Sequence, residues 1–116
     1  MDLGGSLVVA NKSGEMLFTF EFGSNVEACT ISPNGDLVSV ATLYPDNSIY
    51  FFDVLQKILL WKYKSHLRRD PILELKFRGD QLEVFTGHTV ATKEKRYTLE
   101  KDGSLTVDYQ NKLNDL

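Results

Sequence analysis

The sequence predicts an all-β protein built of short antiparallel strands, and three observations support this fold class. Val, Ile and Thr together number 21 and the aromatic residues 13, whereas alanine, the best helix former, occurs four times. Apolar residues recur at every second position, as in Leu73, Leu75 and Phe77, and no long window has helical periodicity. Turn signals such as Asn34-Gly35 recur at close spacing along the whole chain.

The runs between these turns predict the individual strands. Ser13-Gly14 separates residues 6–11 from 15–22, and Asn34-Gly35 separates 26–32 from 36–43. After Tyr44-Pro45, the expected strands are 48–54, 57–63, 72–78, 81–86, 89–99 and 104–110. The residues expected to be largely buried are Cys29, Ile31, Val38, Val40, Ile49, Phe51 and Trp61.

An internal repeat organises these strands. The segment SLVVANKSGEMLFTFEF (6–22) aligns with SIYFFDVLQKILLWKY (48–63), and VEACTISPNGDLVSVAT (26–42) aligns with ILELKFRGDQLEVFTG (72–87). The matched pairs are Leu7 with Ile49, Val9 with Phe51, and Phe18 with Trp61. A period of about 42–46 residues with four short strands is typical of a β-propeller. We therefore expect antiparallel four-stranded blades in an incomplete propeller, within a single β domain over 1–116. Its parts are a half-blade (6–22), a blade (26–63) and a second blade (72–110).

Several short motifs in these blades have counterparts in known repeats. Ile31-Ser32-Pro33-Asn34-Gly35 matches a turn between the first two strands of a blade, and Asp46-Asn47-Ser48-Ile49 matches the entry to its third strand. Phe52-Asp53 stands in place of Trp-Asp, and Ser65-His66 in place of Gly-His. Leu60-Trp61-Lys62-Tyr63 is closer to quinoprotein repeats. Residues 6 to about 87 thus resemble the WD-repeat and quinoprotein-like β-propeller superfamily, a resemblance that implies a binding function.

The chain is short for a propeller. A closed ring needs at least about four blades, which takes about 160 residues at this period, whereas the chain has 116. An uncovered apolar blade face would then remain, so a homo-oligomer or an obligate complex with a protein partner is expected.

Composition and motifs exclude several function classes. The net charge of −3 removes the generic case for a wholly basic nucleic-acid binder, and a single cysteine excludes an internal disulfide framework. No signal peptide and no membrane-spanning run are visible, so a cytoplasmic protein without membrane partners is expected. No catalytic, metal-binding or cofactor-binding motif is found, and we do not expect an enzyme.

Charge is unevenly distributed along the chain. Residues 1–60 contain two Lys or Arg and seven Asp or Glu, residues 61–101 contain ten and six, and residues 102–116 contain one and three. This asymmetry fits head-to-tail association of copies, a basic patch for nucleic acid, or an uneven solvated surface.

The expected function is a non-catalytic protein–protein interaction or assembly module. The alternatives are a fragment or subunit of a larger quinoprotein-like enzyme, or a nucleic-acid-binding subunit. Because each strand reverses the chain, the loops divide between two rims. The rim with the longer loops contains Tyr44, His66, Arg68, Arg69 and His88. Arg and Tyr often anchor interfaces, so we expect partner contacts on this rim.

Overall fold

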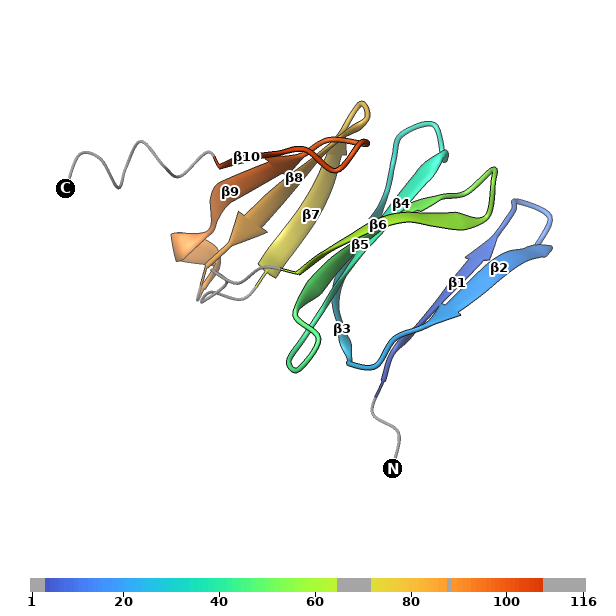
Figure 1. Cartoon of the computed structure of the whole chain (residues 1–116), viewed down its shortest axis with the longest axis horizontal. Helices are drawn as coiled ribbons and strands as arrows, with labels where there is room; N and C mark the ends of the chain where they lie inside the picture. Colours follow the sequence, from blue (N-terminus) through green and yellow to red (C-terminus); the bar gives the residue numbers. More distant parts are fainter. Residues whose placement is uncertain (1–3, 65–71, 88, 108–116) are drawn as a thin grey trace.

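A computed structural model shows three antiparallel β-sheets arranged side by side (Figure 1). The structure describes residues 4–64, 72–87 and 89–107. Sheet A contains β1 (Ser6–Ala10) and β2 (Met16–Glu21). Sheet B contains β3 (Val26–Ile31), β4 (Leu37–Thr42), β5 (Ser48–Asp53) and β6 (Ile58–Lys64). Sheet C contains β7 (Ile72–Arg78), β8 (Gln81–Thr86), β9 (Glu94–Leu99) and β10 (Leu105–Val107). In every sheet, strands that follow one another in the chain are also neighbours in space.

The predicted all-β class and the antiparallel pairing are confirmed, and one predicted strand needs correction. Residues 89–99 do not form one continuous strand, because Val90–Thr92 is a short 3-10 helix that precedes β9. The Thr92 hydroxyl donates a hydrogen bond to the Thr89 carbonyl and accepts one from the Thr89 N–H. These two bonds close the turn. The predicted strand 104–110 is seen as β10, and its residues 108–110 lie outside the described part of the chain.

Sheets B and C share an apolar core. Phe51 on β5 is fully buried, and its ring lies 4.7 Å from that of Trp61 and 5.5 Å from that of Phe77, between ring centroids. The other buried members come from both sheets: Leu37, Ala41, Ile49, Ile72, Leu75, Leu82, Val84, Tyr97 and Leu99. This core joins the two sheets face to face.

A second core joins sheets A and B. Leu7 and Val9 on β1 pack with Val38, Val40, Tyr50, Phe52 and Val54 of sheet B and with Phe22. Alternate residues of β5 therefore face opposite sheets, with Ile49 and Phe51 toward sheet C and Tyr50 and Phe52 toward sheet A. Every side chain of β5 is buried for this reason.

The internal repeat of the sequence is also visible in the packing. Leu7 and Val9 of β1 face sheet B, just as Ile49 and Phe51 of β5 face sheet C. Val9 pairs with Phe18 across sheet A, and Phe51 pairs with Trp61 across sheet B. The packing of sheet A on sheet B is therefore similar to the packing of the β5–β6 half of sheet B on sheet C. The counterparts of β3 and β4 are not among the strands of sheet A.

The outer face of sheet C is largely polar, whereas the outer face of sheet A also contains exposed apolar residues. On sheet C, Lys93 forms an ion pair with Glu74 at 2.8 Å, and Lys95 forms one with Glu83 at 3.4 Å. On sheet A, Ser6 lies opposite Glu21 and Val8 lies opposite Thr19, and Val8 and Met16 are 59% and 63% exposed. The outer face of sheet A therefore combines polar residues with exposed apolar ones.

Most of the predicted core is buried, but three residues differ. Val38, Val40, Ile49 and Phe51 are buried as expected. Ile31 is 56% exposed and Cys29 is also exposed, so both predictions were wrong, and Trp61 is only partly buried. Ile31 and Cys29 are exposed because, within the described residues, sheet A has two strands and does not extend over β3.

Candidate partner-binding site

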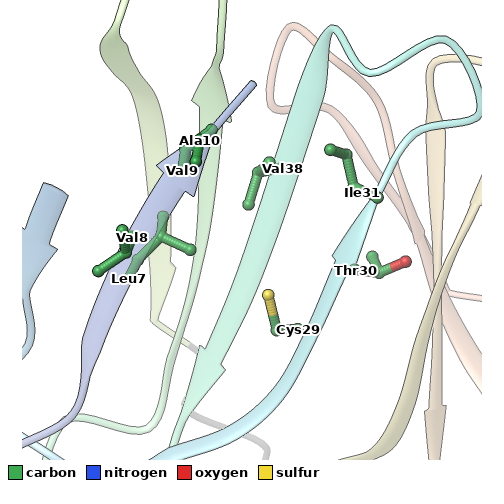
Figure 2. Close-up of a pocket in the computed structure, with 8 residues that line it drawn as sticks. All are labelled: Leu7, Val8, Val9, Ala10, Cys29, Thr30, Ile31 and Val38. Carbon is green, nitrogen blue, oxygen red and sulfur yellow. The ribbon is translucent and has the colours of Figure 1, made fainter. Parts of the chain in front are cut away.

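An open groove of about 330 Å³ lies between sheet A and the β3–β4 half of sheet B. Its lining residues are Leu7, Val8, Val9, Ala10, Cys29, Thr30, Ile31 and Val38. Figure 2 shows Val38 on β4 between the residues of β1 and those of β3. The lining contains no charged side chain, so this surface is apolar.

One wall of the groove is the face of sheet B that sheet A leaves open. Ile31 pairs with Val38 and Cys29 pairs with Val40, and directly paired residues project from the same face of a sheet. Val38 and Val40 are buried, whereas Ile31 and Cys29 are exposed. The covered and uncovered parts of this face are therefore continuous, and the boundary between them runs along β4.

The other wall is the edge of β1 that faces away from β2, and among residues 4–64, 72–87 and 89–107 no strand pairs with this edge. The N–H of Gly5 donates to the Ser24 carbonyl at 3.0 Å, and the N–H of Asn11 donates to Glu15 at 2.9 Å, both on the β2 side. Because main-chain groups alternate in direction along a strand, the N–H and C=O groups of Ser6, Val8 and Ala10 point away from β2. No strand of the described part of the chain pairs with these groups, so they are available to form hydrogen bonds with an added strand.

Cys29 is the only nucleophilic thiol of the chain, and it lies in this groove. Although Cys29 is exposed, its neighbours partly desolvate the thiol and raise its pKa, so the protonated form dominates at neutral pH. None of the groove-lining residues is a histidine or carboxylate that could serve as its base. The groove is therefore suited to binding, and its residues do not form a catalytic arrangement.

A separate polar cluster lies at the turn between β4 and β5. The carboxylate of Asp46 accepts hydrogen bonds from Tyr50 at 2.6 Å, from Thr42 at 3.0 Å and from Ser48 at 3.0 Å. Lys62 forms an ion pair with the same carboxylate at 3.1 Å. Asp46, Tyr50 and Lys62 also line a shallow pocket of about 400 Å³ together with Gly23, Ser24, Pro45 and Lys64.

The protonation states in this cluster are fixed by its contacts. Burial alone would raise the pKa of Asp46, but the hydrogen bonds from Tyr50, Lys62, Thr42 and Ser48 outweigh it and lower the pKa. Hydrogen bonds to Asp46 and Tyr50 raise the pKa of Lys62. Burial and the hydrogen bond to Asp46 raise the pKa of Tyr50. At neutral pH the cluster holds an ionised Asp–Lys pair and a neutral phenol, an arrangement that stabilises the turn.

The structure places one of the predicted rim residues. Tyr44 lies in the β4–β5 turn, beside the polar cluster, and is 82% exposed. His66, Arg68, Arg69 and His88 lie outside the described residues. The β4–β5 turn is at the opposite end of sheet B from the β3–β4 turn, as the antiparallel order requires (Figure 1). Tyr44 and the Ile31 end of the groove are therefore at different ends of this sheet.

Sequence reasoning did not identify the groove. The signal was present, because the first repeat contains only the counterparts of β5 and β6. Sequence alignment of Leu7 with Ile49 places β1 at the position of a third strand. If the first two strands of a blade are absent, the edge of the third strand is exposed, and so is the part of the next sheet that they would cover.

Other kinds of site have less support in the structure. Among residues 4–64, 72–87 and 89–107, no group of three or more His, Cys, Asp or Glu could hold a metal ion. Within the same described ranges, no helix is both long and apolar enough to cross a membrane. The lysines Lys62, Lys93 and Lys95 each have a carboxylate partner, so they do not form an uncompensated basic patch.

The fold defines a class, an all-β protein of antiparallel sheets packed face to face. No protein-family model matches the chain, and no curated protein matches it.

Proposed function

We propose that this chain is a non-catalytic protein-interaction module of propeller-type blades, and that it binds an extended partner segment in the groove beside β1. Two observations support the propeller-type reading. Sheet A packs on sheet B as the β5–β6 half of sheet B packs on sheet C. The first strands of sheets B and C, β3 and β7, also lie in contact with each other.

The observation that carries the binding proposal is the unpaired edge of β1 beside the exposed Ile31 and Cys29. An unpaired strand edge is a template for another strand, and main-chain hydrogen bonds then supply much of the affinity. The groove adds an apolar wall that can bury alternate side chains of that strand. Covering this apolar wall adds a hydrophobic contribution to binding, which is partly offset by the cost of ordering the partner segment.

The only cysteine of the chain provides a direct readout of groove occupancy. Cys29 is exposed, so iodoacetamide should alkylate it at a measurable rate in the free protein. A seven-residue probe peptide with the sequence of residues 36–42 (DLVSVAT) contains β4, which pairs with β5 as an added strand would pair with β1. We expect saturating peptide to slow the alkylation of Cys29, whereas a scrambled peptide should not.

Two matched variants locate the effect. Ile31→Arg places a charge in the groove and should abolish protection of Cys29 by the peptide. Leu55→Arg adds the same charge at an exposed apolar position outside the groove and should leave protection intact. Tyr44→Ala tests the predicted rim in the same assay and should also leave protection intact. If Ile31→Arg and Leu55→Arg behave alike, the groove is not the binding surface.

A further inference from the structure

We infer that the partner segment is a two-stranded antiparallel β-hairpin of another protein, with apolar side chains no larger than leucine on one face and polar side chains on the other. This inference rests on the proposed function, because it specifies what the groove binds. The repeat within the chain provides the template. Sheets B and C each have four strands, and sheet A has two.

The position of β1 fixes where the added strands would lie. β1 corresponds to β5, and β5 pairs with β4 on the side that is free in β1. A first added strand would therefore pair with β1 as β4 pairs with β5. A second strand, joined to the first by a tight turn, would lie beside β3 as β3 lies beside β7. Two strands in these places extend the established interface between sheets A and B across the whole face of sheet B.

The template also fixes the side chains that fit. Leu37 and Ala41 of β4 face sheet C, and the Ser39 hydroxyl between them donates to the Tyr50 carbonyl at 2.9 Å. The strand beside β1 would present residues of similar size toward Val38 and Ile31. Its other face would continue the outer face of sheet A, where Ser6 and Glu21 are exposed. Polar residues on that face would remain in water, which makes the hairpin amphipathic.

A second copy of this chain does not fit the same place. Antiparallel pairing of β1 with its copy requires a two-fold axis perpendicular to the sheet, which leaves corresponding faces on the same side. Leu7 and Val9 of both copies would then point in one direction, and each pair packs on its own sheet B. The sheet B of the copy would have to occupy the space already filled by β3 and β4. The occupant must therefore be a hairpin that has no second sheet attached to its inner face.

The chain itself supplies a probe for the hairpin. Residues 25–43 contain β3, the Asn34-Gly35 turn and β4, which are the strands that hold the equivalent place on sheet C. A backbone-cyclised peptide of this sequence with Cys29→Ser, Ile31→Thr, Val38→Thr and Val40→Thr is polar on the face that would remain in water. It also has no thiol of its own, so alkylation still reports only on the protein. Cyclisation is needed because an isolated hairpin is only marginally stable in water.

The test compares this cyclic hairpin with the single-strand peptide 36–42 in the alkylation assay. We expect half-maximal protection of Cys29 at a hairpin concentration at least about tenfold lower than that of the single-strand peptide. The reason is that the hairpin covers both β1 and β3 and is preorganised. Val8→Pro removes a main-chain donor that points away from β2, and it should weaken hairpin binding at least about tenfold. Val8→Ala keeps that donor and should have a much smaller effect.

The outcomes separate this inference from the proposed function. If the single-strand peptide protects Cys29 as well as the hairpin does, the hairpin inference is overturned. The proposed binding of an extended segment beside β1 is then still supported. If neither peptide protects Cys29 in a protein that circular dichroism shows to be folded, both the hairpin inference and the proposed binding function are overturned. If Cys29 becomes protected without peptide as protein concentration rises, and light scattering shows a dimer, the occupant is a second copy and the hairpin inference is again overturned.

Discussion

The Tyr50 hydroxyl donates a 2.6 Å hydrogen bond to the carboxylate of Asp46. Asp46 lies in the turn that leads into β5, and Tyr50 is a buried residue of that strand. The bond fixes the turn to the face of sheet B that packs on sheet A. Lys62 on β6 contacts both groups, since it pairs with the carboxylate and lies 5.3 Å from the centre of the Tyr50 ring. One carboxylate thus joins three consecutive elements of sheet B.

Asp46→Asn should lower the free energy of unfolding by about 1–3 kcal/mol at neutral pH, because it disturbs a carboxylate with several charge-assisted hydrogen bonds. Folding lowers the pKa of Asp46, so its contribution is fully present above the unfolded pKa of about 3.9. The contribution is lost as pH falls through the lower folded pKa. Urea unfolding across this range should show the difference between wild type and variant shrinking at acid pH.

Asp80→Asn is the matched control, because Asp80 is exposed in the turn between β7 and β8. It should change the unfolding free energy by no more than about 0.5 kcal/mol at any pH. A difference between wild type and Asp46→Asn that stays constant down to the lowest pH would argue against the role of the ionised carboxylate.

Two threonines at corresponding strand ends should respond differently to the same substitution. The Thr42 hydroxyl hydrogen-bonds with Asp46 and with the Ser48 main chain, so Thr42→Val should destabilise by about 1–3 kcal/mol. The Thr86 hydroxyl is buried and has no hydrogen-bond partner in the described structure. Thr86→Val removes that unsatisfied group at nearly constant shape and should be neutral or stabilising. Thermal unfolding of the two variants measures the contrast, and equal losses at both sites would contradict it.

Much of the fold could be predicted from the sequence because local signals were consistent. β5 is an example, since its alternation places Ile49 and Phe51 on one face and Tyr50 and Phe52 on the other. The 3-10 turn at Val90–Thr92 was missed because Thr and Val also favour strands, and only the Thr92 hydrogen bonds distinguish the turn. The exposure of Ile31 could not be predicted from local sequence, because it depends on strands that sheet A does not contain.

In the Asp46 cluster, too, some features could be predicted from local sequence and others could not. The Asp46-Asn47-Ser48 turn could be predicted from its residues. The contact with Lys62 depends on the pairing of Tyr50 with Lys62 across β5 and β6, which follows only from the exact register. The groove likewise depends on how sheets A and B meet, a relationship that spans two elements distant in the chain.

Gly87→Ala should be destabilising because there is no space for a side chain. A Cβ at Gly87 would lie 2.7 Å from the carbonyl oxygen of Thr92, and main-chain atoms cannot move aside cheaply. We expect a loss of about 1–3 kcal/mol in the free energy of unfolding. Gly23→Ala is the control, since nothing lies within 4 Å of its Cβ position. If denaturant titration gives the same midpoint for both variants, the close approach of Gly87 to Thr92 does not exist in solution.

Ile31 and Val40 lie on the same face of sheet B and test whether its β3 edge is uncovered. Val40 is 1% exposed beneath sheet A, and Val40→Ala should cost about 1–3 kcal/mol through lost burial and a residual cavity. Ile31 is 56% exposed in the groove, so Ile31→Ala should cost no more than about 0.5 kcal/mol even though it removes a larger side chain. Chemical unfolding of both variants at low protein concentration gives the comparison. If Ile31→Ala costs as much as Val40→Ala, Ile31 is covered in solution and the groove is already filled. If the cost of Ile31→Ala is small alone but rises when the cyclic hairpin is added, the hairpin stabilises the folded protein through Ile31.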